Sequence, residues 1–127
     1  MRALLDTHTF LWAALGDQDL SATARGVLED GSNELFLSAV SAWEIAIKYG
    51  RNLPLHEPPD EYVPSRIARL GLRALPIEVR HALHVYTLPR IHRDPFDRLL
   101  IAQAQLEGLP ILTSDANIAR YDVEVIW

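Results

Sequence analysis

Residues 1–12 read MRALLDTHTFLW, an apolar run that stops at an acidic residue and passes into a helix-like pattern. The continuous run Ala3-Leu4-Leu5 predicts a buried strand, because a strand covered on both faces shows no polar alternation. Residues 7–15 then predict a short helix that ends near Gly16. The carboxylate of Asp6 is therefore expected at the carboxyl end of a buried strand.

The same unit of a short apolar run followed by a helical segment recurs along the chain. Four more runs predict strands, at residues 35–37, 72–75, 110–113 and 123–126. Five more segments predict helices, at residues 21–28, from 38 or 41 to about 49, 61–70, 78–88 and 95–106. Alternation of this kind predicts an α/β protein whose parallel sheet is covered on both faces.

The segment 95–106 gives the clearest helix prediction. Asp94 is a favourable N-cap, Pro95 suits the first turn, and Gly108 follows the expected end. The segment is apolar nearly all round, and we therefore expect it to be buried.

Length and composition favour one domain over residues 1–127. The chain is 49% hydrophobic and 23% charged, which excludes a disordered protein. The proline-rich stretch 52–60 resembles a connection inside that domain. No apolar run approaches the roughly 20 residues that span a bilayer, and no segment is typical of a signal peptide, so a cytoplasmic protein is expected. The absence of cysteine excludes disulfides and thiolate zinc sites.

Four acidic residues lie where strands end or helices begin: Asp6, Glu44, Asp97 and Asp115. Asp6 and Asp115 directly follow the first and fourth predicted strands. Glu44 lies one to two turns into the helix after the second strand, and Asp97 lies in the first turn of the helix 95–106. Ligands of open parallel sheets bind outside the carboxyl ends of the strands, so all four acids are expected at one edge.

Each acid also has an ordinary structural explanation, and these alternatives stay open. Asp6 is a suitable N-cap for the helix at Thr7, and Asp97 complements the positive end of its helix. Glu44 matches a capping box with Ser41, or an ion pair with Lys48 one turn away. Asp115 could cap a turn over residues 116–121.

Carboxylates that converge cannot all stay ionised without a cation, because like charges raise one another's pKa. Oxygen ligands without softer groups suit Mg²⁺ or Mn²⁺. The formal net charge of −5 falls to −1 when the four acids are left out, so most of the excess acidity belongs to this one candidate site. Such a site favours metal-assisted hydrolysis of a phosphodiester.

Other polar and aromatic residues give weaker indications. His81 and His84 are three apart and could contact one metal, but without an obvious third ligand they are predicted to be surface or half-buried residues. His8 and His92 flank candidate acids and stay open as substrate contacts or packing residues. Trp12 and Trp43 are predicted to lie in the core, and Thr113 and Ser114 could bind a phosphate or form turn hydrogen bonds. The two arginine groups are either solvated faces or local basic patches: Arg66, Arg69 and Arg73, and Arg90, Arg93 and Arg98.

Several enzyme classes are disfavoured by motifs that the chain lacks. The dinucleotide fingerprint and the P-loop are absent. A phosphatase with a second aspartate two residues after its nucleophile does not match Asp6-Thr7-His8, and no Gly-x-Ser-x-Gly elbow marks a serine hydrolase.

Four segments together resemble the PIN-domain proteins, and more narrowly the VapC-type toxins of bacterial toxin–antitoxin pairs. These segments are LLDTHTFLW (4–12), SAVSAWEIAIK (38–48), HRDPFDRLLIAQA (92–104) and LTSD (112–115). The resemblance implies a three-layer α/β/α sandwich with a central parallel sheet. It also implies a Mg²⁺- or Mn²⁺-dependent endoribonuclease, with Asp6, Glu44 and Asp97 as main metal ligands, direct or through water. Asp115 would bind a second metal or act without touching one.

The same resemblance implies partners. A homodimer and a cognate antitoxin that binds at or near the site are expected, with RNA as the substrate. Two alternatives remain: a non-catalytic binding module that keeps the PIN fold, and a metal-dependent phosphatase that acts on small phosphorylated molecules.

Overall fold

One five-stranded sheet forms the centre of the computed structural model, which describes residues 1–127. Its strands are β1 (Arg2–Leu5), β2 (Glu34–Ser38), β3 (Arg73–Leu75), β4 (Ile111–Leu112) and β5 (Val125–Ile126). The order is β3-β2-β1-β4-β5, and every neighbouring pair is parallel. The chain therefore builds outward from β1 to one side and then returns to build β4 and β5 on the other. The β1/β4 pair is the point where that direction reverses.

Helices connect the strands. They are α1 (Thr7–Leu15), α2 (Ala22–Glu29), α3 (Ala39–Lys48), α4 (Pro59–Leu70), α5 (Val79–His84) and α6 (Pro95–Glu107), with 3₁₀ turns η1 (Val85–Thr87) and η2 (Ile118–Arg120). The helices predicted at 7–15, 21–28, 61–70 and 95–106 are confirmed to within two residues at each end. None of the helices is long and apolar enough to cross a membrane.

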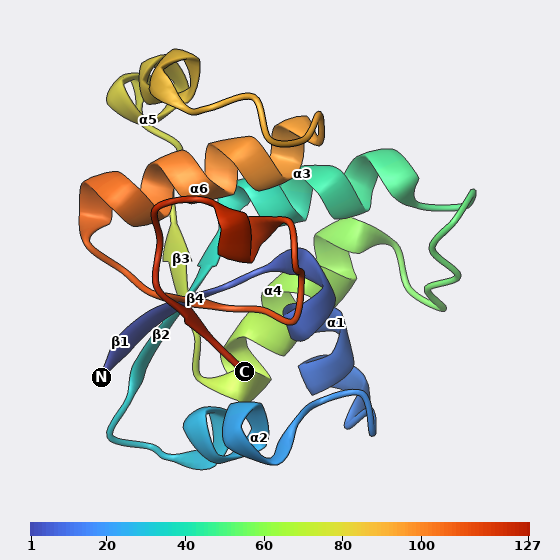
Figure 1. The fold of residues 1–127 in the computed structure, drawn as a ribbon. Coiled ribbons are helices and arrows are strands. Elements are labelled where there is room, and N and C mark those ends of the chain that lie inside the picture. Colours follow the sequence, from blue (N-terminus) through green and yellow to red (C-terminus); the bar gives the residue numbers. More distant parts are fainter.

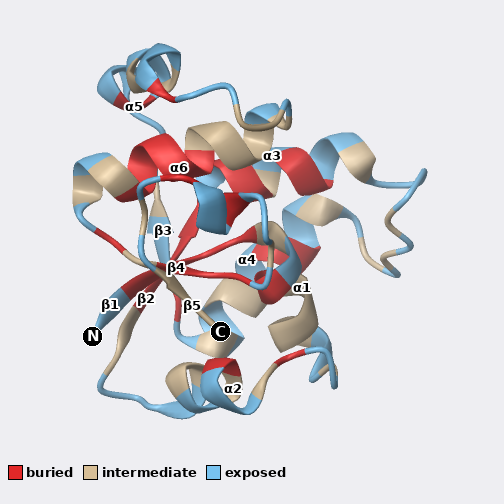
Figure 2. Cartoon of the chain, in the orientation of Figure 1, coloured by how far each residue is buried: buried red, intermediate tan, exposed pale blue.

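Three layers result from the alternation of side chains along the strands, since successive residues point to opposite faces. Leu5 and Leu37 pack with α1, α2, α3 and α4, whereas Leu4 and Phe36 pack with α6 and η2. In Figure 1, α5 and α6 lie above the sheet and α1, α2 and α4 lie below it, and Figure 2 shows the buried strands between these layers. The predicted α/β/α sandwich is confirmed.

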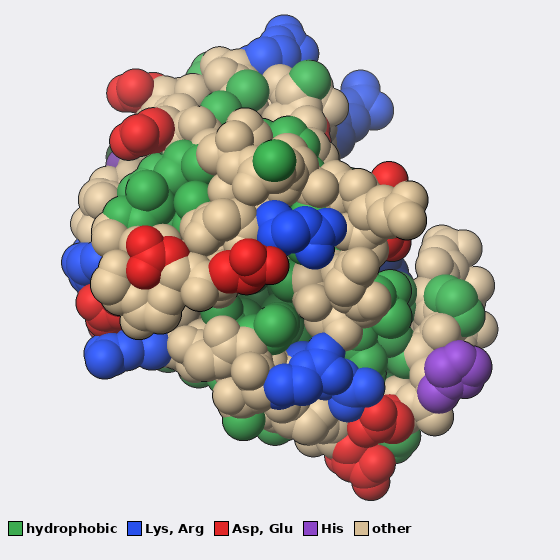
Figure 3. All heavy atoms as spheres, turned by 90° about the horizontal axis from the view of Figure 1, so that it is seen from below, with side chains coloured by type: hydrophobic (Ala, Val, Ile, Leu, Met, Phe, Trp, Pro, Cys, Tyr) green, Lys and Arg blue, Asp and Glu red, His purple; other side chains and the backbone are tan.

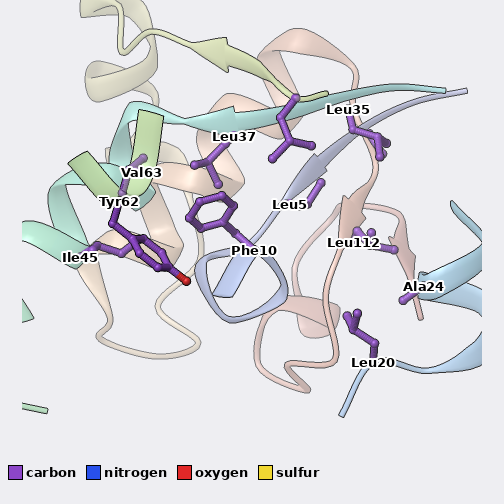
Figure 4. Packing of buried hydrophobic residues seen from close by; sticks show 12 residues of the cluster. Leu5, Phe10, Leu20, Ala24, Leu35, Leu37, Ile45, Tyr62, Val63 and Leu112 are labelled. Carbon is purple, nitrogen blue, oxygen red and sulfur yellow. The ribbon is translucent and has the colours of Figure 1, made fainter. Parts of the chain in front are cut away.

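The lower core is organised around Phe10 of α1. Figure 4 shows its ring among Leu5, Leu37 and Tyr62, and Phe10 is fully buried. Full burial of such a side chain contributes about 1.5–3 kcal/mol to stability. This packing fixes the start of α1 against the carboxyl end of β1, and it therefore fixes the backbone at Asp6.

Three local predictions are wrong or incomplete. Trp43 was expected in the core, but its side chain is 50% exposed on α3. The segment 78–88 forms α5 and η1 instead of one helix. Pro89 follows it, and Arg98 of α6 donates hydrogen bonds to the carbonyl oxygens of Val85 and Leu88. The helix α6 is buried at residues 100–104, but Leu106 is exposed.

The outer face of the lower layer has no patch of charged side chains of a single sign. Figure 3 views the molecule from the side of α2, where acidic and basic side chains are interspersed around apolar surface. The marked concentration of acids must therefore be sought elsewhere, at the carboxyl edge of the sheet.

Candidate functional site

Asp6 lies at the reversal point of the sheet, one residue after β1, and is 5% exposed. Its Oδ1 accepts a hydrogen bond from the Thr9 backbone N–H at 2.9 Å, which makes it the N-cap of α1. Its Oδ2 accepts from the Thr113 hydroxyl at 2.6 Å, across the β1/β4 pair. Reversal points of open parallel sheets are where their ligands bind. The residue that caps α1 therefore also lies where the ligands of such sheets bind.

Thr113 also joins Asp115 to Asp6. The Asp115 backbone N–H donates to the Thr113 hydroxyl oxygen at 3.0 Å, so the segment that follows β4 is held beside the residue after β1. The Asp115 side chain accepts from the Asn117 N–H at 2.8 Å and caps the turn before η2. Asp115 is half-buried, and its turn-capping role is confirmed.

Glu44 approaches from α3, on the other side of Asp6. Its Oε1 accepts from the hydroxyl of Thr7, the residue after Asp6, at 2.7 Å, and it is 4% exposed. Its Oε2 pairs with Lys48, and this hydrogen bond raises the pKa of Lys48 above its ordinary value. The expected ion pair is present. The capping box is not, because Ser38 caps α3, and the Ser41 hydroxyl lies 3.0 Å from Thr7 Oγ1, whose own proton is directed to Glu44.

Asp97 lies in the first turn of α6, where Asp94 caps the helix as predicted. Burial raises the pKa of Asp97 to about 6, although a hydrogen bond from His92 opposes the shift. The charges of Asp94 and Asp115 raise the pKa of Asp97 further. Asp97 and Asp115 are therefore close enough for their charges to interact. Buried carboxylates that repel one another are typical of functional sites.

The four acids thus gather along one edge, and their donor set fits a hard cation. All the candidate ligand atoms are carboxylate oxygens, with threonine hydroxyls between them. No three of the acids bring ligand atoms within 4.8 Å of one another. A cation such as Mg²⁺, which keeps several waters, would therefore contact most of these acids through water.

A tighter cluster lies outside this edge, where ligand atoms of Glu78, His81 and Glu107 are within 4.8 Å of one another. His81 was expected at the surface or half-buried, but it is fully buried. Its Nδ1 accepts from the Glu78 backbone N–H at 2.9 Å, so the neutral ring carries its proton on Nε2, which donates to Glu107 at 2.9 Å. A metal bound to Nε2 would require the ring proton on Nδ1. The Glu78 backbone N–H already donates to Nδ1, so a proton there would face another proton. Arg80 also pairs with both acids, so we interpret the cluster as a link between α5 and α6.

Further side chains border the acids in ways that sequence patterns did not specify. Trp43, beside Glu44, packs edge-on against Phe96, beside Asp97, with ring centroids 4.9 Å apart. His92 contacts Asp97, whereas His8 is exposed and packs against a tryptophan ring. The sequence already singles out the two histidines by their proximity to candidate acids, and the same signal could have identified the Trp43–Phe96 pair.

Comparisons with known proteins agree with this architecture. A model of the PIN domain matches residues 3–124. Ribonuclease VapC16 from Mycobacterium tuberculosis is 44% identical over 61 residues, which is 47% of this chain and 43% of that protein. The aligned part thus spans less than half the length of that relative.

Two solved structures share the fold over almost the whole chain. VapBC2 from Rickettsia felis, bound to a DNA fragment from its promoter, matches with a TM-score of 0.72 at 12% identity, covering 98% of this chain and 97% of that one. A toxin–antitoxin complex from Klebsiella pneumoniae matches with a TM-score of 0.67 at 18% identity, covering 98% and 96%. The family model covers nearly all of the sheet and all four candidate acids, and this chain belongs to the PIN domain family.

Proposed function

We propose that this protein is a metal-dependent endoribonuclease and the toxin of a toxin–antitoxin pair. The observation that supports this most is the gathering of four acids at the reversal point of a PIN-family sheet. The relative named as a ribonuclease and the fold shared with toxin–antitoxin complexes support the same proposal.

In this proposal Asp6, Glu44 and Asp97 hold Mg²⁺ or Mn²⁺, directly or through water, and Asp115 either contributes a further ligand or acts without contact. The cation would lower the pKa of a bound water and stabilise the charge that develops on the phosphodiester. Thr113 and the Thr9 N–H orient the Asp6 carboxylate. Lys48 balances part of the charge of Glu44.

RNA is the proposed substrate, and exposed cations near Asp97 support that choice. A hollow beside His92 is lined by Arg90, Arg93 and Arg98, and the first two are exposed. Arg98 donates to the Pro89 carbonyl oxygen at 2.7 Å and is therefore an internal anchor. Arg90 and Arg93 are free to meet the phosphates of an RNA strand.

The proposed partners are a cognate antitoxin and a second copy of this chain. Both would cover apolar surface, and η1 and α5 expose Val79, Leu83 and Tyr86. A second apolar groove lies between α3 and α4, lined among others by Ala42, Val63 and Ile67. An arginine from the antitoxin would suit the acidic edge, because guanidinium and carboxylate pair in a bidentate manner.

The sharpest test replaces Asp6 with asparagine. Asn caps a helix about as well as Asp, so Asp6→Asn removes the charge while the start of α1 is kept. Purified wild-type protein should cleave RNA with Mg²⁺ or Mn²⁺ and lose that activity in EDTA, and Asp6→Asn should be inactive at unchanged fold. The matched control is Glu29→Gln, an exposed acid at the end of α2.

The outcomes separate the alternatives. Equal cleavage by Asp6→Asn would show that the proposed site is wrong. Wild-type protein that binds RNA but never cuts it would favour a binding module, and turnover of a phosphomonoester alone would favour a phosphatase. RNA ends mapped after induced expression, with and without the neighbouring open reading frame, would identify the cut and the antitoxin together.

A further inference from the structure

The hydroxyl of Tyr121 lies between the two segments that carry Asp97 and Asp115. Tyr121 directly follows η2, in the loop that begins at Asp115, and it is 5% exposed. His92 lies just before α6, and Arg98 lies one residue after Asp97. Hydrogen bonds of Tyr121 to His92 and Arg98 therefore join the last loop of the chain to the start of α6.

The single proton of this hydroxyl can be assigned by counting its neighbours. A phenolic hydroxyl has one proton to donate and two lone pairs that accept. Arg98 Nη1 donates to the oxygen at 3.1 Å, and the His92 backbone N–H donates at 3.3 Å. These two donors use both lone pairs. The hydroxyl proton is therefore directed to its third neighbour, His92 Nδ1, at 2.7 Å.

This assignment fixes the tautomer of His92. Because Nδ1 accepts a hydrogen bond from the Tyr121 hydroxyl, a neutral imidazole must carry its own proton on Nε2. Nε2 lies 3.0 Å from Asp97 Oδ2, so the ring donates to that carboxylate oxygen. The His92 and Asp97 side chains are 13% and 18% exposed, which limits competition from water.

The far end of the network is held in place. Arg98 donates to the Pro89 carbonyl oxygen at 2.7 Å and also lies 3.4 Å and 3.5 Å from the carbonyl oxygens of Val85 and Leu88. The rings of Tyr121 and His92 pack edge to face, with centroids 5.4 Å apart and planes inclined by 64°. The network is therefore fixed at Arg98 by backbone carbonyl oxygens, and at its other end the His92 N–H points at the Asp97 carboxylate.

We propose that Arg98, Tyr121 and His92 are positioning residues, which hold His92 as its Nε2–H tautomer and thereby hold Asp97 by Oδ2. Oδ1 of Asp97 is left for the divalent cation. This inference rests on the proposed function, since it gives Asp97 a cation to bind. It also couples the loop 115–121 to α6, so that the two acids keep a fixed relative position.

The first test measures the tautomer in the metal-free protein. Long-range ¹⁵N–¹H NMR spectra of the wild type should show His92 with its proton on Nε2. Tyr121→Phe keeps the ring but removes the hydroxyl, so His92 should become a mixture of tautomers. Tyr62→Phe is the matched control, because this buried tyrosine lies in the other core cluster. An Nδ1–H tautomer in the wild type, or an unchanged spectrum in Tyr121→Phe, would overturn the proposal.

The second test measures Mn²⁺ affinity by calorimetry, without RNA. His92→Phe should weaken binding by about 10–100-fold, the usual effect of losing a partner that orients a metal ligand. His92→Gln should recover most of the affinity, because its amide N–H₂ can reach Asp97 as Nε2 does. Rescue by Gln is not expected if His92 serves as packing alone. Equal Mn²⁺ affinity in the wild type and His92→Phe would contradict the proposal.

We call the hydrogen-bond chain from Arg98 through Tyr121 and His92 to Asp97 the relay. Failure of the relay and failure of the proposed function give different results. A wild type that shows the Nε2–H tautomer and His92-dependent Mn²⁺ binding, yet cuts no RNA, would retain the relay and reject the ribonuclease. A wild type that cuts RNA with unchanged activity and Mn²⁺ affinity in His92→Phe and Tyr121→Phe would retain the ribonuclease and reject the relay.

Discussion

At the scale of single residues, the candidate site is built from side chains that each do two things. Asp6 caps α1 with one oxygen and receives the Thr113 hydroxyl on the other. Glu44 accepts from a threonine and pairs with Lys48. Each carboxylate therefore has two oxygens with different partners, and a capping or ion-pairing role does not exclude the proposed metal role. Asp→Asn removes the charge and keeps one acceptor oxygen, which can still cap α1 at position 6, but it replaces the oxygen that accepts from Thr113 with an N–H₂ donor.

The raised pKa of Asp97 predicts a dependence of stability on pH in the metal-free protein. The carboxyl has a pKa of about 6 in the folded chain against an ordinary value of 3.8, so between these pH values the folded chain retains a proton that the unfolded chain releases. Stability should therefore fall as pH rises from about 4 to 6 and stay lower above that. Asp97→Asn should remove this loss.

Urea unfolding in EDTA checks this prediction. A shift of this size corresponds to at most about 3 kcal/mol, and partial exposure of the side chain reduces that to roughly 1–2 kcal/mol. Asp97→Asn should exceed the wild type by this amount at pH 8 and match it near pH 4, while losing RNA cleavage. A difference that is the same at both pH values would contradict the assigned cause.

At the scale of elements, apolar runs and caps accounted for most helices and strands, because their signals are local. The helix at residues 7–15 was predicted at its observed bounds, from Leu4-Leu5 before it and Gly16 after it. The break between α5 and η1 was missed, because it depends on Arg98, which reaches it from α6. Trp43 was misplaced because a helical apolar pattern does not reveal which apolar positions stay exposed.

The glycine that ends α6 gives a test at this scale. Gly108 has φ of +65°, and a Cβ there would meet nothing within 4 Å, so backbone strain is the sole expected cost of Ala. Gly108→Ala should destabilise the protein by about 1–2 kcal/mol.

Gly26 is the matched control for that substitution. It lies inside α2 without a positive φ, and its Cβ position is equally open. Gly26→Ala should therefore stabilise the protein by about 0.4–1 kcal/mol. Thermal melts of the two variants should shift in opposite directions, and shifts of the same sign would reject the conformational explanation.

At the scale of the whole molecule, one rule of sheet topology brought distant acids to one edge. The sequence allowed that inference because Asp6 and Asp115 each follow an apolar run. The contacts of His92 with Tyr121 and of His81 with Glu107 could not be inferred in this way, because they link residues 29 and 26 positions apart through helix packing. The positions of the acids were predictable, whereas the side chains that orient them required the structure.

Cation binding at the acidic edge should stabilise the whole fold. A ligand at a hundredfold excess over its Kd, if it binds the folded state alone, adds about 2.7 kcal/mol. Melting temperature should therefore rise with MnCl₂, and Asp6→Asn should show most of that rise lost. NaCl at equal ionic strength is the control, because it screens charge without specific ligation. An equal rise with both salts would show that screening explains the effect.

The hydrogen bond between Asp6 and Thr113 joins residues 107 positions apart, so its two partners are translated at different times. Asp6 is therefore translated well before Thr113. At about 5–20 residues per second, the interval is roughly 5–20 s. A nascent chain therefore has no complete acidic edge until Thr113 and Asp115 have been made, and products terminated before these residues never acquire one. For the proposed ribonuclease, the order of the strands alone would keep unfinished chains from cutting the RNA of the ribosome that makes them.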